Sequence, residues 1–281
     1  MTQHDHDHDH DGGLGHDLSR MADFAARRRA LLKWGLGLGA LPLLACAGSN
    51  LDSTDMTGEA GAGTAGTGTG SSDTCSTIPE ETAGPYPGDG TNGANALALA
   101  GIVRSDITTS VDGASGVAQG VPLTVKLTVL DGQNGCAPIA GYAVYIWHCD
   151  RAGNYSMYSA AAANENYLRG VQETDADGTV TFTTIFPACY SGRWPHIHFE
   201  VYPSLAVASS GNNKVATSQL ALPEAACDDV FATDGYAASV ANLSQVSLAS
   251  DMVFSDSVTQ QTPTMSGSVS EGYVAKLNVT I

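Results

Sequence analysis

Basic residues are few in this sequence. Of its 281 residues only 12 are Lys or Arg, against 29 Asp or Glu, and the formal net charge is −17. Residues 1–46 hold five of the basic and six of the acidic residues, which leaves seven against 23 in the rest of the chain. Such an acidic surface repels phosphate backbones, so we expect no nucleic-acid partner. An anionic substrate would need a local cation to offset the general field.

Histidine is scarce beyond the N-terminal tail. Five of the eight histidines lie within residues 4–16, and only His148, His196 and His198 follow. A metal site in the folded region has too few imidazoles for an all-histidine cage, so it must recruit other ligand types. The alternation of His and Asp over residues 4–10 could chelate metal, but it lies ahead of an export signal and is interpreted as a solvated tail.

The N-terminal region also lacks an apolar run long enough for a permanent membrane helix. Its apolar stretch, residues 34–44, is well short of the ~20 residues that span a bilayer. Basic residues at 27–33 precede this stretch, which is the order of a signal peptide. The pair Arg28 and Arg29 resembles the twin-arginine signal, a route for folded and often cofactor-loaded proteins.

Residues 43–46 read Leu-Leu-Ala-Cys, which resembles a bacterial lipobox. We therefore expect residues 1–46 to be a twin-arginine-type lipoprotein signal with a His- and Asp-rich tail, and Cys46 to be lipidated. The protein would then be exported, to the periplasm or the cell surface, and held at the membrane only through this lipid. A simply cleaved signal and an uncleaved anchor are the alternatives. Residues 47–73 predict a flexible Gly-, Thr- and Ser-rich linker, and residues 74–281 a single domain.

An odd number of cysteines remains once Cys46 is set aside. In an oxidising compartment this predicts two disulfides and one free thiol among five residues, and the spacing does not give the pairing. The five are Cys75, Cys136, Cys149, Cys189 and Cys227. Cys149 and Cys189 flank two tyrosine-bearing segments, and a bridge between them would fix the spacing of those tyrosines.

Helical periodicity is weak throughout the domain, with an exception only at residues 160–164. Two alternating runs and one nearly continuous apolar run predict strands, at residues 123–129, 273–281 and 142–149. We expect residues 180–186 to form a strand that pairs with the preceding segment through the turn at 175–178. The sequence therefore predicts an all-β fold, an antiparallel β-sandwich whose long loops carry the function.

The run from Arg193 to Tyr202 carries the first sign of chemistry. In a strand, His196 and His198 point to the same face with Cα atoms about 6.6 Å apart, so both imidazoles can reach one metal. Ile197, Phe199 and Val201 alternate with them and point the other way, into the expected core. A His-x-His pair alone is as often a chance feature of a surface strand as a metal site.

The neighbours of this pair decide which metal it would suit. Zinc would need a third ligand, for which Glu200 and Cys189 are candidates, but a lone thiol is vulnerable in an oxidising compartment. Tyr190 and Tyr155 offer phenol oxygens, which bind as phenolates only beside a strong positive charge. Two phenolates and a hydroxide would neutralise a ferric ion, and two imidazoles would complete five positions.

The ordered motifs around these residues resemble the intradiol ring-cleavage dioxygenase family. The matching segments are residues 147–156, 168–172, 177–187, Tyr190 and residues 193–198. The segment Pro79 to Tyr86 also matches the motif Pro-Glu-x-Thr-x-Gly-Pro-Tyr of exported dioxygenase-like members. The resemblance is strong over about residues 75–224 and weaker toward the C-terminus.

The resemblance implies the roles of individual residues and the reaction. Tyr155 and His196 would be equatorial ligands of Fe(III), and Tyr190 and His198 axial ones. In the family a catechol gives up two protons, displaces the axial tyrosine and binds iron through both oxygens before O2 attacks the ring, and a muconate-type product results. Tyr190 would thus be catalytic as well as a ligand. Arg193 and Gln219 match the active-site arginine and glutamine of the family, and they would be the other catalytic residues.

Departures from the family pattern leave the substrate open. Only Ser191 and Gly192 separate Tyr190 from Arg193, so a pocket wall present in many catechol enzymes would be missing here. Free catechol, a protocatechuate-like acid and larger polyphenols or lignin fragments all remain candidates. The alternatives to an enzyme of this family are a non-catalytic cell-surface sandwich that binds aromatic or carbohydrate ligands and a zinc hydrolase with Glu200 as its carboxylate.

Overall fold

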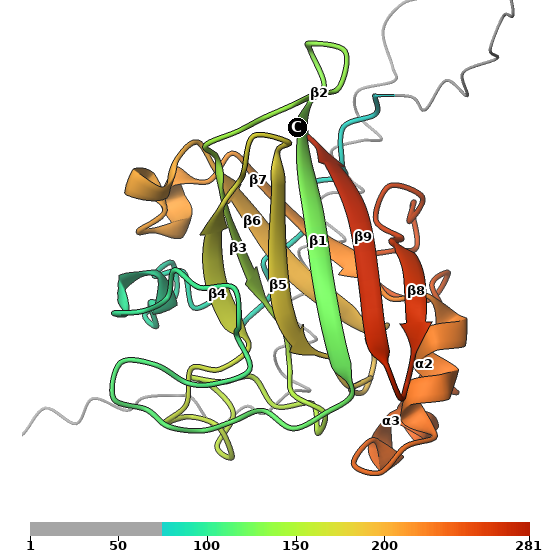
Figure 1. Cartoon of the computed structure of the whole chain (residues 1–281). Coiled ribbons are helices and arrows are strands. Elements are labelled where there is room, and N and C mark those ends of the chain that lie inside the picture. Colours follow the sequence, from blue (N-terminus) through green and yellow to red (C-terminus); the bar gives the residue numbers. More distant parts are fainter. Residues whose placement is uncertain (1–74) are drawn as a thin grey trace, which may run out of the picture. The chain divides into compact units, whose positions relative to one another are not determined.

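Two β-sheets face each other across the main hydrophobic core (Figure 1). The structure is a computed structural model of the chain, and it describes residues 75–281. The expected signal at residues 1–46, with Cys46, and the linker at 47–73 lie outside the described residues. No helix within residues 75–281 has the length and apolar character needed to cross a membrane.

One sheet has four antiparallel strands, and the other has five. The first runs in the order β4 (Arg169–Glu173), β3 (Ala143–Trp147), β6 (His196–Tyr202) and β7 (Ala216–Ala221). The second contains β2 (Ala137–Pro138), β1 (Pro122–Asp131), β9 (Gly272–Thr280) and β8 (Thr264–Ser268), with β5 (Thr179–Ile185) also paired to β1. All pairs are antiparallel except β1 with β9, which is parallel. The all-β sandwich prediction is confirmed, with this one parallel pair as its exception.

The strand predictions hold for position, but one predicted pairing is wrong. The alternating runs form β1 and β9, and the continuous apolar run forms β3, in which all five residues are buried. The segment at residues 180–186 does form a strand, β5, yet β5 pairs with β1 and not with β4 before it. The turn at residues 175–178 carries the chain from one sheet to the other, so the two segments it joins are not hydrogen-bonded neighbours.

The core lies between the sheets and is lined by alternate residues of the strands. Leu123, Val125 and Leu127 of β1 are buried there, because residues two apart in a strand share a face. Ile197 and Phe199 of β6 enter the same core from the opposite sheet, as predicted. The other face of β6 therefore points away from the core, and His196 and His198 lie on it.

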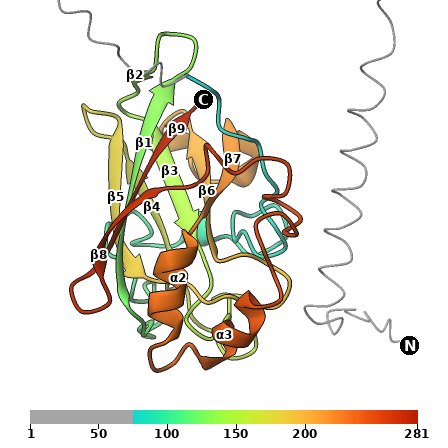
Figure 2. The same cartoon turned by 90° about the vertical axis from the view of Figure 1, so that its right-hand side faces the viewer.

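Two short helices cover one end of the sandwich (Figures 1 and 2). Helix α2 (Glu224–Phe231) buries apolar side chains in the main core, and α3 (Ala237–Leu243) follows it directly. Three 3-10 turns, η1 (Ala96–Ala98), η2 (Leu205–Val207) and η3 (Gly211–Asn213), lie in the connections. The helical exception expected at residues 160–164 is wrong, because this segment forms turns.

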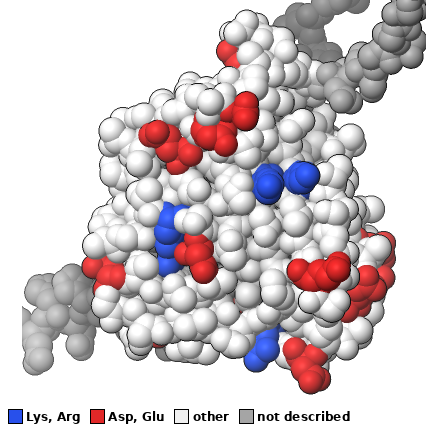
Figure 3. All heavy atoms as spheres, viewed as in Figure 1, with Lys and Arg blue, Asp and Glu red and all other residues white. Residues whose placement is uncertain are grey.

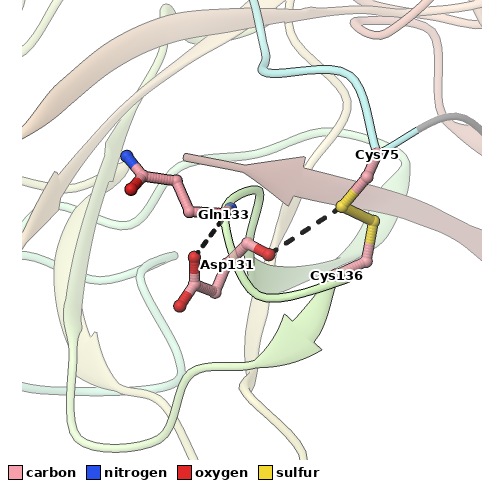
Figure 4. The surroundings of a disulfide bond; sticks show 4 residues. All are labelled: Cys75, Asp131, Gln133 and Cys136. Carbon is pink, nitrogen blue, oxygen red and sulfur yellow. Dashed lines mark hydrogen bonds between the residues drawn. A yellow bond between two sulfur atoms is a disulfide. The ribbon is translucent and has the colours of Figure 1, made fainter.

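The described residues contain one disulfide, between Cys75 and Cys136, beside the end of β1 (Figure 4). The prediction of two disulfides is wrong, and so is the suggested bridge between Cys149 and Cys189. Both of these thiols and that of Cys227 are buried and free. The thiol of Cys149 donates to the carbonyl of Ala188 at 3.7 Å, and Cys189 donates to the carbonyl of Arg193 at 3.4 Å. The expectation that four of the five cysteines form disulfides fails, because three of them are buried in the core, where cysteine packs as a small apolar residue.

Acidic groups are spread over the face of the molecule drawn in Figure 3, and the basic groups on that face are few, with two of them side by side. This distribution agrees with the excess of acidic residues in the sequence.

Candidate metal centre

The two histidines of β6 form the base of the candidate centre. Their Nε2 atoms lie 3.1 Å apart on the outer face of the four-stranded sheet. Both side chains are buried, at 2% exposure for His196 and 3% for His198. The strand period therefore produced the convergence that the sequence predicts for this pair.

Two loops bring the tyrosines to the same point. Tyr155 lies in the loop after β3, where the carboxylate of Asp150 accepts the backbone N–H groups of Ala152 and Asn154 and closes a tight turn. Tyr190 lies between β5 and β6. Gly153, at the tip of the first loop, has a φ of +90° and packs against the side chain of Tyr190. The turn conformation and the close approach of the loops both favour glycine at this position.

The phenol oxygens and the imidazole nitrogens lie within contact distance of one another. The Tyr155 oxygen is 3.4 Å from Nε2 of each histidine and 3.5 Å from the Tyr190 oxygen, which is 3.2 Å from Nε2 of His196. Nitrogen and oxygen ligands lie about 2.0–2.2 Å from a first-row metal ion, so ligands at 90–120° to each other are about 3.0–3.6 Å apart. The observed separations fit donors arranged around one ion.

The two imidazoles are held in different ways. Nδ1 of His196 lies 2.5 Å from the carbonyl oxygen of Trp194, which fixes the proton on Nδ1 and leaves the Nε2 lone pair directed at the tyrosines. His198 instead stacks on the indole of Trp147 at a centroid distance of 4.8 Å and an angle of 4°. Its Nδ1 is buried and has no hydrogen-bond partner among residues 75–281. Trp147 and His198 are directly opposed in the β3–β6 ladder, which brings the rings together.

Burial controls the ionisation of all four groups. It raises the pKa of Tyr190 to about 12 and the pKa of Tyr155 well above its ordinary value. It lowers the pKa of His196 to about 3 and the pKa of His198 well below its ordinary value, with further lowering by nearby positive charge. The imidazoles are therefore neutral and able to donate lone pairs, whereas the phenols need a nearby cation before they ionise. These ionisation properties fit a site for a strongly charged metal ion.

Known proteins resemble this chain in sequence and in structure. A family model described as "Dioxygenase" matches residues 100–204. An intradiol ring-cleavage dioxygenase from Tetranychus urticae aligns in structure over 74% of this chain and 95% of its own, with a TM-score of 0.57 and 27% identity. The chain is a relative of the intradiol ring-cleavage dioxygenases.

Curated relatives agree with this family over shorter stretches. Catechol 1,2-dioxygenase 2 of Acinetobacter lwoffii is 33% identical over 95 residues, which are 34% of this chain and 33% of that protein. Chlorocatechol 1,2-dioxygenase of Rhodococcus opacus is 38% identical over 53 residues, which are 19% of this chain and 21% of that protein. These matches thus span about a third and a fifth of the lengths of the two relatives.

The family-matched region contains the four candidate ligands and Arg193, whereas Gln219 lies beyond it. Arg193 is buried beside the site, and its Nη2 donates to Oε1 of Gln219 at 2.7 Å. Gln219 is directly opposed to His198 in the β6–β7 ladder, and its Nε2 donates to the carbonyl of Thr82 at 2.9 Å. The structure thus brings Arg193 and Gln219 together, and Gln219 connects this pair to the Pro79–Tyr86 motif.

His148 and Glu200 are both engaged in hydrogen bonds away from the four candidate ligands. Both ring nitrogens of His148 are hydrogen-bonded, to the Cys149 carbonyl at 2.8 Å and the Thr184 hydroxyl at 2.7 Å, so this buried histidine has no nitrogen left to bind a metal. Glu200 accepts hydrogen bonds from Tyr202 and Lys214 at 2.6 and 2.9 Å. Both carboxylate oxygens of the proposed zinc base are thus engaged in a separate buried cluster.

Three residues near the site were not found from the sequence. Asp251 accepts from Arg193, Trp147 stacks on His198, and Arg169 donates to Ser156 Oγ and to the Ser156 carbonyl, next to Tyr155. Trp147 could have been placed by aligning the two predicted strands. Asp251 offers no such signal, because 58 residues separate it from its partner Arg193.

Proposed function

We propose that this protein is an intradiol dioxygenase that binds one ferric ion and cleaves a catechol-type ring between its two hydroxylated carbons with O2. The ligands would be the phenol oxygens of Tyr155 and Tyr190 and the Nε2 atoms of His196 and His198. The observation that carries the proposal is the convergence of these four atoms, with separations of 3.1–3.5 Å. Two phenolates and two neutral imidazoles suit Fe(III) better than Zn(II) or Mg(II).

When bound, ferric iron supplies the Lewis acidity that favours an ionised catechol and makes its ring reactive toward O2. In the overall reaction both atoms of O2 enter the product. The carbon–carbon bond between the hydroxylated carbons breaks and each becomes a carboxyl carbon, so that O2 is reduced as the ring carbons are oxidised. The product would be a muconate-type dicarboxylate.

Tyr190 is the ligand best placed to move a proton. It is half-buried, whereas Tyr155 is 2% exposed, so Tyr190 faces the side from which a substrate can enter. Burial raises the pKa of its phenol to about 12, which makes its phenolate a strong base. The Tyr190 oxygen would accept a proton from a catechol hydroxyl as the substrate takes its place.

Arg193 would hold a positive charge beside the reacting ring. Its Nη1 is buried and donates to no other group within residues 75–281, while Nε and Nη2 are both engaged. Its charge is close enough to lower the pKa values of Tyr190 and His196. A free N–H donor and a fixed charge at this place would stabilise negative charge that develops on the substrate.

We propose a catechol as the substrate class, and we single out no particular substituted catechol. The turn between Tyr190 and Arg193 contains only Ser191 and Gly192, and both are exposed. A turn this short would leave room for ring substituents that catechol itself lacks. Two relatives are a catechol and a chlorocatechol dioxygenase, and their activities support a catechol substrate here.

We also propose that the enzyme acts outside the cytoplasmic membrane, anchored by a lipid on Cys46. The support is the order of a basic run, an apolar stretch and a lipobox-like sequence within residues 27–46. Replacing Cys46 by Ala should release the protein from the membrane fraction. A protein that stays membrane-bound after this change would contradict lipid anchoring.

One experiment tests the proposed function. The protein is loaded with Fe(III), its visible spectrum is recorded, catechol is added under nitrogen, and O2 uptake is then measured over a panel of catechols. We expect a red-brown tyrosinate charge-transfer band that shifts on catechol binding, followed by uptake of one O2 per catechol. A protein that binds zinc, stays colourless with iron or takes up no O2 with any catechol would contradict the proposal.

A further inference from the structure

We infer that Asp251 is the positioning residue of this site, which holds the guanidinium of Arg193 in place and anchors the peptide that orients His196. This inference rests on the proposed function, because it assigns a role within the same reaction. Asp251 lies outside the family-matched region at residues 100–204, in the segment that follows α3.

Asp251 fixes one edge of the Arg193 side chain. Its Oδ2 accepts from Nε of Arg193 at 2.9 Å, and both side chains have 0% exposure. Gln219 accepts from Nη2 of the same guanidinium at 2.7 Å. Because a guanidinium is planar, two anchored nitrogens define the direction of the third, and Nη1 is left as the free donor.

The same carboxylate oxygen reaches the metal ligand by a second path. Oδ2 of Asp251 also accepts the backbone N–H of Trp194 at 2.7 Å. The carbonyl oxygen of Trp194 lies 2.5 Å from Nδ1 of His196. One acceptor atom therefore holds both Arg193 and the residue that fixes the imidazole of His196.

Asp251 is itself rigidly held. Its Oδ1 accepts the backbone N–H groups of Val253 at 2.8 Å and Phe254 at 3.1 Å. Val253 and Phe254 pack with Trp194 and Ala221 in a separate apolar cluster. The ring of Phe254 also lies 5.8 Å from the Arg193 guanidinium carbon. Each carboxylate oxygen thus accepts two hydrogen bonds.

The ionised form of this pair is the one the surroundings favour. Burial alone would raise the pKa of Asp251, but the charge of Arg193 and the hydrogen bonds from Arg193 and Trp194 lower it below its ordinary value. Leaving a buried guanidinium without its carboxylate would be costly, so the arginine would reorient. Arg193 therefore depends on Asp251 for its direction as well as for its charge balance.

A double-mutant cycle tests this role. Asp251→Asn, Arg193→Gln and the double variant are compared with Asp256→Asn, a control at an exposed carboxylate in the same segment that accepts from the Ser257 N–H. We expect Asp251→Asn to lower kcat at least tenfold, roughly the effect of losing one well-placed catalytic contact. In the Arg193→Gln background it should change kcat by less than about twofold, because the two residues act as a unit. The control should match the unchanged protein.

A spectroscopic readout separates positioning from loss of fold. Under nitrogen no turnover occurs, and the catechol complexes of the variants can be compared at equal iron content. Asp251→Asn and Arg193→Gln should show the same visible band, shifted from that of the catechol complex of the unchanged protein. The inference would be overturned if the fold-losses in kcat of the two single variants multiplied in the double variant. A visible band in Asp251→Asn equal to that of the unchanged protein would also overturn it.

A second variant serves if Asp251→Asn fails to fold. Arg193→Lys keeps the positive charge but lacks a planar fork that can bind Asp251 and Gln219 together, so it should be as impaired as Arg193→Gln. Full activity in Arg193→Lys would overturn the inference. If the unchanged protein binds iron and catechol but never takes up O2, the proposed function fails, whereas the anaerobic spectra still test the role of Asp251.

Discussion

A Cβ atom placed on Gly153 would lie 3.3 Å from the Cβ atom of Tyr190. The contact joins the two loops that carry the candidate tyrosine ligands, and a side chain at Gly153 would have to displace Tyr190 slightly. The position of one ligand thus depends on a backbone feature of the other ligand's loop.

Gly153→Ala should therefore weaken iron binding. The substitution strains a backbone at φ +90° and pushes Tyr190 outward, with a cost of roughly 1–3 kcal/mol. Gly141→Ala is the matched control, since Gly141 has a φ of +80° and no atom of residues 75–281 beyond its own chain neighbours lies within 4 Å of an added Cβ. Iron titration with thermal unfolding should show similar stability losses for both variants but weaker iron binding only for Gly153→Ala. Equal iron affinities would show that the contact does not control Tyr190.

Removing a ligand and removing Arg193 should have separable effects. Tyr155→Phe deletes an oxygen that lies 3.4 Å from Nε2 of both histidines, so it should abolish the visible band and most bound iron. Arg193→Ala leaves all four donors in place, so it should keep iron and colour while kcat falls at least tenfold. Iron analysis and visible spectra of both variants measure the difference. A colourless, iron-free Arg193→Ala protein would contradict this division of roles.

The stability of the metal-free protein should depend on pH through His148. Burial lowers the pKa of this imidazole from 6.5 to about 4 in the folded state. Between these values the unfolded chain binds a proton that the folded protein does not, so the contribution is complete above pH 6.5 and is lost as pH falls toward 4. His148→Gln lacks this group, so between pH 7 and 4 the unchanged protein should lose roughly 3 kcal/mol more than the variant. Denaturant unfolding curves with parallel pH dependence for both proteins would refute the assignment.

The disulfide should stabilise the domain without affecting the metal centre. It closes a loop with a sequence separation of 61, and removing such a cross-link typically costs roughly 2–4 kcal/mol. Cys136 precedes β2, which leads into the start of β3, whereas Trp147 at the far end of β3 pairs with His198. The double variant Cys75→Ser, Cys136→Ser should therefore unfold at lower denaturant concentration but show an unchanged iron spectrum. An altered spectrum in this variant would mean that the disulfide supports the site.

Sequence patterns correctly predicted the parts of the site that depend on local backbone geometry. A strand period of two is enough to place His196 and His198 on one face and Ile197 in the core. The meeting of Tyr155 and Tyr190 with that pair came from the family resemblance, since no local pattern relates residues on two loops. The pairing of β5 with β1 could not be read, because a short turn can join strands within one sheet or between two.

Other features have no local signal at all. Helices α2 and α3 are eight and seven residues long and have no side-chain cap, so their periodicity is too brief to identify. The link between Arg193 and Asp251 depends on how the C-terminal segment folds back onto β6. The cysteine count misled because three thiols are buried in the cores of the domain.

Resonance Raman spectroscopy of the Fe(III)-loaded protein, excited in its visible band, tests the central claim most directly. If Tyr155 and Tyr190 both bind iron as phenolates, two sets of tyrosinate vibrations should be enhanced. Tyr190→Phe should then remove one set, while Tyr155→Phe should abolish the band together with most of the bound iron. A spectrum without tyrosinate vibrations, or one unchanged by both substitutions, would contradict a ferric centre built from these side chains.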